Sequence, residues 1–195
     1  MQETNDLVKQ RLLALEEIKN MGINPYPHRF DVTANSAEIL STFKDPADEA
    51  EAEAQKLKII SVAGRIMAIR KMGKASFFQI KDDTGKIQIY IRQNDVGEEL
   101  YKLFKLLDIG DIIGVNGFVF RTKMGEVSVH ATAIELLTKT LQPLPVVKEE
   151  TSETGEKIIH DAFADVELRY RQRYIDLIVN DHVKETFRSE ERRVG

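Results

Sequence analysis

The sequence predicts a mainly β domain with helices before and after it, and residues 62–91 carry most of that prediction. A basic glycine turn and a polar glycine turn divide this stretch into three runs of strand-forming residues. In the second and third runs, residues 76–82 and 86–92, apolar and polar side chains alternate. Such alternation places one set of side chains in a core and the other set on an outer face.

The outer face predicted for these two strands combines aromatic, amide and cationic side chains. Its members are Phe77, Gln79, Lys81, Lys86, Gln88, Tyr90 and Arg92. An exposed aromatic ring among amides and cations suits the stacking of a nucleic acid base and hydrogen bonding to its edge. The face therefore favours a nucleic acid partner.

Helices are predicted ahead of the strands. Residues 5–21 carry apolar side chains near helical spacing, and Gly22 is the expected stop. A short helix is expected from Ser36, as its N-cap, to Phe43. Residues 45–58, with Pro46 near the first turn, predict a short exposed helix. Residues 1–58 are accordingly expected to form an N-terminal helical extension.

After the third strand the predicted elements are a helix over 98–107, a strand over 112–122 and a strand over 126–137. In the last strand Val127, Val129, Ala131 and Ala133 are expected to face inward, and Glu126, Ser128, His130 and Thr132 outward. The order of three strands, a helix and two strands, over residues 59–137, is typical of the OB-fold, a five-stranded Greek-key barrel. Such barrels bind oligonucleotides on strands two and three and in the loops joining strands one to two and four to five.

Both of these loops are basic and contain a glycine. The first holds Arg70, Lys71, Gly73 and Lys74, and the second holds Arg121, Lys123, Gly125 and Glu126. The formal net charge of the chain is −4, yet residues 62–132 contain 11 basic and 8 acidic side chains. The cations thus concentrate where an anionic partner would bind.

Composition excludes several other classes of protein. The chain has no cysteine, which rules out a disulfide framework or thiolate metal site and fits a reducing cytosol. Its four histidines lack the spacing of metal ligands, so no metal site is expected. No apolar run is long enough to cross a membrane and no secretory leader is visible, so a cytoplasmic protein without a membrane partner is expected.

Residues 138–164 contain two closely spaced prolines and a polar run, and are expected to be a linker. A helical period returns in residues 165–187, with Leu168, Tyr174, Leu177 and Ile178 available for packing and with arginines between them. This helix is too short to be a domain and is expected to begin one.

Four segments, taken in order, closely resemble the N-terminal portion of bacterial-type class II lysyl-tRNA synthetases, the lysine–tRNA ligases. They are residues 62–91, 107–131, 136–145 and 168–181. Within them, GKASF, LTK-x-L-x-PLP and RYRQRY-x-DL are specific to the family in combination. The resemblance extends from the first helix to about Phe187.

The resemblance implies that the barrel binds the anticodon of lysine tRNA. Phe77 matches the aromatic residue on which the central anticodon uridine stacks, Gln88 and Arg70 match side chains that contact the edge of that base, and Glu126 matches an acidic contact. Lys74 and Lys123 are expected to hold phosphates. Three further RNA-binding candidates are Tyr90, Gln79 and Arg65. Phe77 could instead cover a barrel edge, and Arg65 could pair with an acidic residue of the neighbouring helix.

Members of the family activate lysine with ATP and magnesium, transfer it to tRNA and are dimeric. Their chemistry lies in a class II catalytic domain whose three motifs are absent from residues 1–195. The resemblance therefore implies a truncated ligase, inactive by itself, with no catalytic, cofactor-binding or metal-binding residue in this chain. Residues 165–187 would be the start of the missing domain.

Residues 188–195, RSEERRVG, depart from the family pattern. The string matches the translation of a common sequencing-library adapter and is expected to be a non-biological tail, the alternative being a genuine charged tail. For the function, the alternative to a ligase part is a free-standing OB-fold module that binds single-stranded nucleic acid or tRNA without catalysis. A protein-interaction barrel is disfavoured by the two basic loops.

Overall fold

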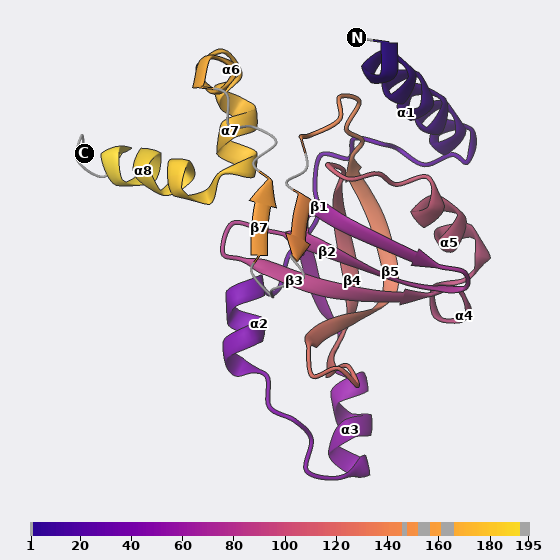
Figure 1. Cartoon of the computed structure of the whole chain (residues 1–195). Coiled ribbons are helices and arrows are strands. Elements are labelled where there is room, and N and C mark those ends of the chain that lie inside the picture. The colour runs from indigo at the N-terminus through magenta and orange to yellow at the C-terminus, as the bar shows by residue number, and fades with distance from the viewer. Residues whose placement is uncertain (1, 146–147, 152–156, 161–165, 192–195) are drawn as a thin grey trace. The chain divides into compact units, whose positions relative to one another are not determined.

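The computed structural model describes residues 2–145, 148–151, 157–160 and 166–191 (Figure 1). The chain divides into two compact units, Met1–Pro143 and Leu144–Gly195, and each is described by itself.

The first unit is built around a closed five-stranded barrel, which confirms the predicted OB-fold. Its strands are β1 (Ile60–Met72), β2 (Ala75–Lys81), β3 (Lys86–Arg92), β4 (Ile112–Arg121) and β5 (Val127–Thr138). They neighbour one another in the order β1-β2-β3-β5-β4, and only β3 and β5 pair in parallel. The connection from β3 to β4 contains α4 (Gln93–Val96), which was not predicted, and α5 (Glu98–Lys105).

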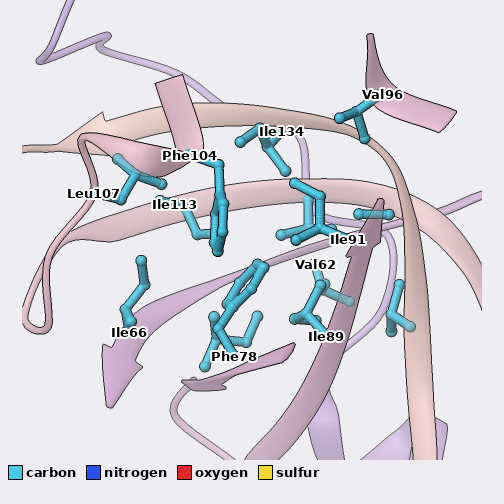
Figure 2. Packing of buried hydrophobic residues seen from close by; sticks show 14 of the residues in the cluster. Val62, Ile66, Phe78, Ile89, Ile91, Val96, Phe104, Leu107, Ile113 and Ile134 are labelled. Atoms are coloured by element: carbon cyan, nitrogen blue, oxygen red, sulfur yellow. The ribbon is translucent and has the colours of Figure 1, made fainter. Parts of the chain in front are cut away.

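The strict alternation predicted for β2 and β3 is confirmed by their burial. Ile80, Ile87, Ile89 and Ile91 are fully enclosed, whereas the polar side chains between them are half-buried or exposed. All four belong to the core cluster that contains Phe104 of α5, and Figure 2 shows Ile89, Ile91 and Phe104 in it. The rings of Phe78 and Phe104 lie 5.3 Å apart, so α5 closes one side of the core.

The predicted faces of β5 are wrong at Ala133, and Ser128 is buried although it lies on the predicted outer face. The β4–β5 register shifts between Asn116 and Gly117, and beyond this bulge Ile134 and Leu136 are buried in place of Ala133. A Cβ on Gly117 would lie 2.0 Å from the carbonyl oxygen of His130, so the close approach of the two strands requires glycine. Ser128, predicted to be outward, is fully buried.

The helical extension is present, with different caps from those predicted. α1 (Gln2–Asn20) is followed by Gly22, the expected stop, which has a φ of 75°. α2 (Ser36–Thr42) is capped by Asn35, whose side chain accepts from the Glu38 N–H at 2.9 Å, so Ser36 is the first helical residue rather than the cap. α3 (Glu49–Lys56) begins after its cap Asp48, later than predicted.

A buried charged network joins α1 to the segment that leaves the barrel. The Lys139 ammonium donates to Asp108 at 2.6 Å and to Asp111 at 2.8 Å, and its side chain is fully enclosed. Arg11 of α1 donates to the carbonyl oxygens of Ile109 and Thr140, at 2.9 and 3.2 Å. The end of β5 is thereby fixed to the first helix.

The second unit begins with two short antiparallel strands, β6 (Lys148–Thr151) and β7 (Lys157–His160), in the segment predicted to be a linker. The single helix expected over 165–187 is three helices: α6 (Val166–Arg171), α7 (Arg173–Val179) and α8 (Asp181–Glu191). Buried Asp176 holds them together by accepting from Arg169 at 3.0 Å, from Arg173 and from Asn180 at 2.7 Å.

The proposed non-biological tail lies partly in α8 and partly, at 192–195, outside the described residues, and its origin stays a prediction, as do the domain boundaries. In the part of the chain that the structure describes, no helix combines the length and apolarity needed to cross a membrane.

Candidate nucleic-acid interface

Two neighbouring rows of residues cross the outer face of the barrel, and each takes one member from every strand. Cross-strand pairing places the first, here called the aromatic row, in the order Arg70, Phe77, Tyr90, His130 and Phe118. The second, here called the amide row, runs through Ala68, Gln79, Gln88, Ser128 and Phe120. Side chains two apart on a strand share a face, so the two rows lie side by side.

A hollow of about 140 Å³ lies over the β1–β2–β3 side of these rows. It is lined by Ala68, Arg70, Phe77, Phe78, Gln79, Gln88 and Glu126. Glu126 comes from the β4–β5 loop, whereas the others come from β1, β2 and β3. The fold thus brings an aromatic ring, two amides, a guanidinium and a carboxylate to one place from 57 residues of sequence, Arg70 to Glu126.

The Phe77 ring is half-buried and supported from one side. Tyr90 lies 4.9 Å from it, centroid to centroid, and the Tyr90 ring also meets His130 edge-on at 5.0 Å. The series continues to Phe118, whose ring lies 4.7 Å from that of His130. Phe77 is therefore the end of a packed row of rings, and it also lines the hollow.

Gln88 is held by β5. Its Nε2 donates to Ser128 Oγ at 2.9 Å, and Ser128 Oγ donates in turn to the Glu126 carbonyl oxygen at 3.3 Å. None of the described residues donates to Gln88 Oε1, which leaves this oxygen for a ligand. Gln79 lies directly opposite Gln88 on β2, so two amides share this part of the hollow.

His130 has a charged partner outside the row. Its Nε2 lies 2.7 Å from Asp95 Oδ2, and Asp95 also accepts from Arg92 at 2.7 and 2.8 Å. The Arg92 hydrogen bonds are the main reason that the pKa of Asp95 is lowered, with His130 adding to the effect against partial burial. The positive charge of Arg92 therefore balances the negative charge of Asp95.

The β1–β2 loop is tied to the segment that follows β3. The Tyr101 hydroxyl of α5 donates to the Gly73 carbonyl oxygen at 2.6 Å. The Gln93 N–H donates to the Lys74 carbonyl oxygen at 2.9 Å. Lys71 Nζ reaches the Lys105 carbonyl oxygen, also at 2.9 Å. The loop that carries Lys74 and the end of β1 that carries Lys71 are thus both fixed by contacts with this segment.

The β4–β5 loop is fixed mainly by backbone bonds. The Thr122 N–H donates to the Glu126 carbonyl oxygen, and the Gly125 N–H donates to the Thr122 carbonyl oxygen. Both distances are 2.9 Å. Arg121 donates to Asp45 of the helical extension at 2.7 Å. Lys123 and Glu126 at this turn are exposed.

The candidate residues therefore divide into three groups. Arg70, Phe77, Gln79, Gln88 and Glu126 line the hollow, and Tyr90 supports Phe77 from the row behind it. Lys74 and Lys123 are exposed on the two loops, beyond the lining.

Arg65 lies away from the hollow lining. It donates to the Gly110 carbonyl oxygen at 2.8 Å, and burial lowers its pKa, against the opposing effect of Asp111. This hydrogen bond ties Arg65 of β1 to the turn before β4, and an RNA contact of Arg65 stays a prediction.

Sequence reasoning missed the outward residues of β4 and the role of Ser128. Phe118 and Phe120 alternate with Val119, and that spacing already places both rings on one face of the strand. Ser128 carries no comparable signal, because its burial and its bond to Gln88 arise only from the parallel pairing of β3 with β5.

Comparisons with known proteins agree with this geometry. Residues 60–137 match a family described as OB-fold nucleic acid binding domain. Over 186 residues, which are 95% of this chain, the sequence is 51% identical to a lysine–tRNA ligase of Carboxydothermus hydrogenoformans. That alignment covers 34% of the relative, so the chain spans about a third of the length of the curated relative it matches. The chain is therefore similar, over residues 60–137, to OB-fold nucleic acid binding domains and, over nearly all of its own length, to part of a lysine–tRNA ligase.

Proposed function

We propose that this chain binds the anticodon loop of lysine tRNA through the hollow, as the tRNA-recognition part of a lysine–tRNA ligase. The observation that carries the proposal is the convergence of Arg70, Phe77, Gln79, Gln88 and Glu126 on one hollow of the barrel. A stacking surface beside side-chain amide groups is the arrangement by which proteins bind single-stranded bases. The similarity to a lysine–tRNA ligase supports lysine tRNA as the partner.

In the proposed complex the central base of the anticodon lies on Phe77. Stacking on an aromatic ring tolerates any base, because every base has a π-face. Selection of uridine therefore comes from groups at its edge, namely the Gln88 amide and the Arg70 guanidinium. Glu126 has a carboxylate that would repel phosphate, so its role is to accept from a base or to orient a neighbouring cation.

Lys74 and Lys123 contact phosphates in this proposal. They lie on the two loops rather than in the hollow, and a lysine ammonium acts on phosphate as a point charge. Their contribution is to affinity and its dependence on salt, and not to selection among bases.

The ATP-dependent attachment of lysine, the homodimer and the cytoplasmic location belong to the proposed full-length enzyme. Among the described residues, no three or more acidic or histidine side chains form a group able to hold a metal ion. No step of the binding proposed here passes through ATP or magnesium, and the expectation that this chain supplies no catalytic residue stays a prediction.

Fluorescence anisotropy with the full chain tests the proposal. The probes are a lysine-tRNA anticodon stem-loop and the same stem-loop with cytidine in place of the central uridine, each at two salt concentrations. We expect a preference for uridine of about 1–3 kcal/mol that Gln88→Ala abolishes.

Equal binding of the two stem-loops, weakened only by salt, would contradict base recognition. That outcome would leave the alternative of a general single-strand-binding module. Binding insensitive to salt would instead favour a surface that contacts protein.

A further inference from the structure

We infer that Ser128 determines base specificity at this site by fixing the orientation of the Gln88 amide. The inference rests on the proposed function, because it concerns how the same hollow selects uridine. Ser128 is not a contact residue in it: it acts through Gln88 and is a positioning residue.

The hydrogen-bond directions follow from the single proton of the serine hydroxyl. Ser128 Oγ donates that proton to the Glu126 carbonyl oxygen, 3.3 Å away, and so can only accept from the Gln88 amide, 2.9 Å away. The group facing Ser128 must therefore be the amide nitrogen. Gln88 Oε1 is then directed away from β5, together with one free N–H.

The alternative arrangement of the Ser128 hydroxyl has one hydrogen bond fewer than the observed one. Its side chain is fully buried, and parallel pairing holds Ser128 opposite Gln88. A flipped amide would place Oε1 against the hydroxyl oxygen, and Ser128 would have to release the Glu126 carbonyl to donate to it. The Glu126 carbonyl would keep the Thr122 N–H, but the flipped arrangement has one hydrogen bond fewer, so the observed orientation is favoured.

The orientation matters because uracil and cytosine differ in the polarity of one edge. Uracil presents an N3–H donor between two carbonyl acceptors, whereas cytosine presents an N3 acceptor beside an amino donor. The fixed amide offers an oxygen to the uracil N3–H and an N–H to a neighbouring carbonyl. Opposite cytosine, the Gln88 amide oxygen would face the N3 acceptor of the base. A flipped amide would match cytosine, so the Ser128 hydrogen bond selects between the two bases.

Ser128→Ala is the test variant, because it removes the acceptor without adding volume. We expect the ratio of uridine to cytidine stem-loop affinities to fall about five- to ten-fold, with the cytidine stem-loop losing little or gaining. Ser128→Thr keeps a hydroxyl and should restore the ratio. Thermal melting and a titration of the active fraction, applied to both variants, separate a change in selectivity from a loss of folded protein.

A second measurement does not depend on RNA. In protein labelled with ¹⁵N-glutamine, the Gln88 side-chain signals are assigned by their loss in Gln88→Ala. Ser128→Ala should shift these signals and accelerate exchange of the amide protons with water.

The possible failures are distinguishable. A wild-type chain that binds both stem-loops equally contradicts the proposed function. A wild-type chain that prefers uridine, with Ser128→Ala keeping the full preference or leaving the Gln88 signals unchanged, overturns the role of Ser128 alone.

Discussion

Phe77 and Gln88 come from adjacent strands of the same hollow, and physical chemistry gives them different effects on binding. A ring stacks on any base, whereas an amide distinguishes donors from acceptors. At the scale of single residues, affinity and selectivity at this site are therefore separable by mutation.

Phe77→Ala should weaken binding of the uridine and cytidine stem-loops equally, by about 1–3 kcal/mol each, and leave their ratio unchanged. Phe77→Trp keeps a stacking surface and should retain most of the affinity. The measurement is fluorescence anisotropy with both stem-loops.

Phe118→Ala is the matched control for that experiment. Phe118 belongs to the same aromatic row but does not line the hollow, so its loss should leave affinity near wild type. An equal loss of affinity in the two variants would contradict the assignment of stacking to Phe77.

At the scale of elements, two short connections carry much of the geometry of the site. The helical segment between β3 and β4 holds the β1–β2 loop by side-chain and backbone bonds from Tyr101 and Gln93. On the other side of β2, the turn to β3 is closed by Asp82, which also reaches α2. The turns at both ends of β2 are thus held by contacts distant in sequence.

Tyr101→Phe should loosen the β1–β2 loop while keeping the ring that packs on Phe104, 5.7 Å away. Loss of the hydroxyl removes the donor to Gly73 and should lower RNA affinity by about 0.5–1.5 kcal/mol. The slope of affinity against salt should also fall if Lys74 loses its phosphate. Hydrogen exchange of the loop amides, with exposed Lys102→Ala as control, measures the loosening; unchanged exchange would contradict it.

Asp82→Asn should destabilise the fold by about 1–3 kcal/mol at pH 7, because Asp82 accepts from the Ser36, Thr84 and Gly85 N–H groups at 2.6–2.9 Å. Burial opposes ionisation here, but the hydrogen bonds from Ser36 and Thr84 outweigh it and lower the pKa of Asp82. A lowered native pKa gives stability that is present above the unfolded value of about 3.9 and is lost as the pH falls through the native value. Urea unfolding should therefore show the difference between wild type and variant shrinking below about pH 4.

At the scale of the whole molecule, the first unit is held together by contacts between α1, the turn before β4 and the end of β5. Lys139 and Asp111 form its buried charged centre, Asp108 adds a partly exposed carboxylate, and Arg11 extends the network to the first helix. These groups stabilise the unit only as a set, because each buried charge needs its partner.

Lys139→Met should lower the free energy of unfolding by about 3–5 kcal/mol, since it leaves Asp111 buried without its cation. Urea denaturation checks the value, and Lys123→Met, on an exposed loop, is the matched control. A loss no larger than the control would show that water or Arg11 compensates.

The sequence was sufficient for elements that are determined by the local alternation or helical spacing of apolar side chains. The alternation in β2 and β3 placed Phe77, Gln79, Gln88 and Tyr90 on the outer face, and the order of elements predicted the barrel. It was insufficient where the burial or contacts of a residue depend on pairing with a second strand. The bulge at Gly117 changes which β5 residues are buried, and Ser128 meets Gln88 only through the closing of the barrel. The cap at Asn35 and the contacts of Arg11 likewise depend on partners that no local pattern identifies.

The pairing that closes the barrel has a consequence for how the molecule responds to its partner. β3 and β5 meet over three residue pairs, which are Gln88 with Ser128, Ile89 with Val129 and Tyr90 with His130. The outward members of that seam belong to the two rows that form the recognition face. The barrel cannot open at this seam without dismantling the site, so a ligand that binds only the closed form stabilises that form, and more so as its concentration rises above its Kd. RNA should therefore slow the exchange of backbone amide protons most strongly in β3 and β5. The ligand would then suppress local opening at the same place where it binds.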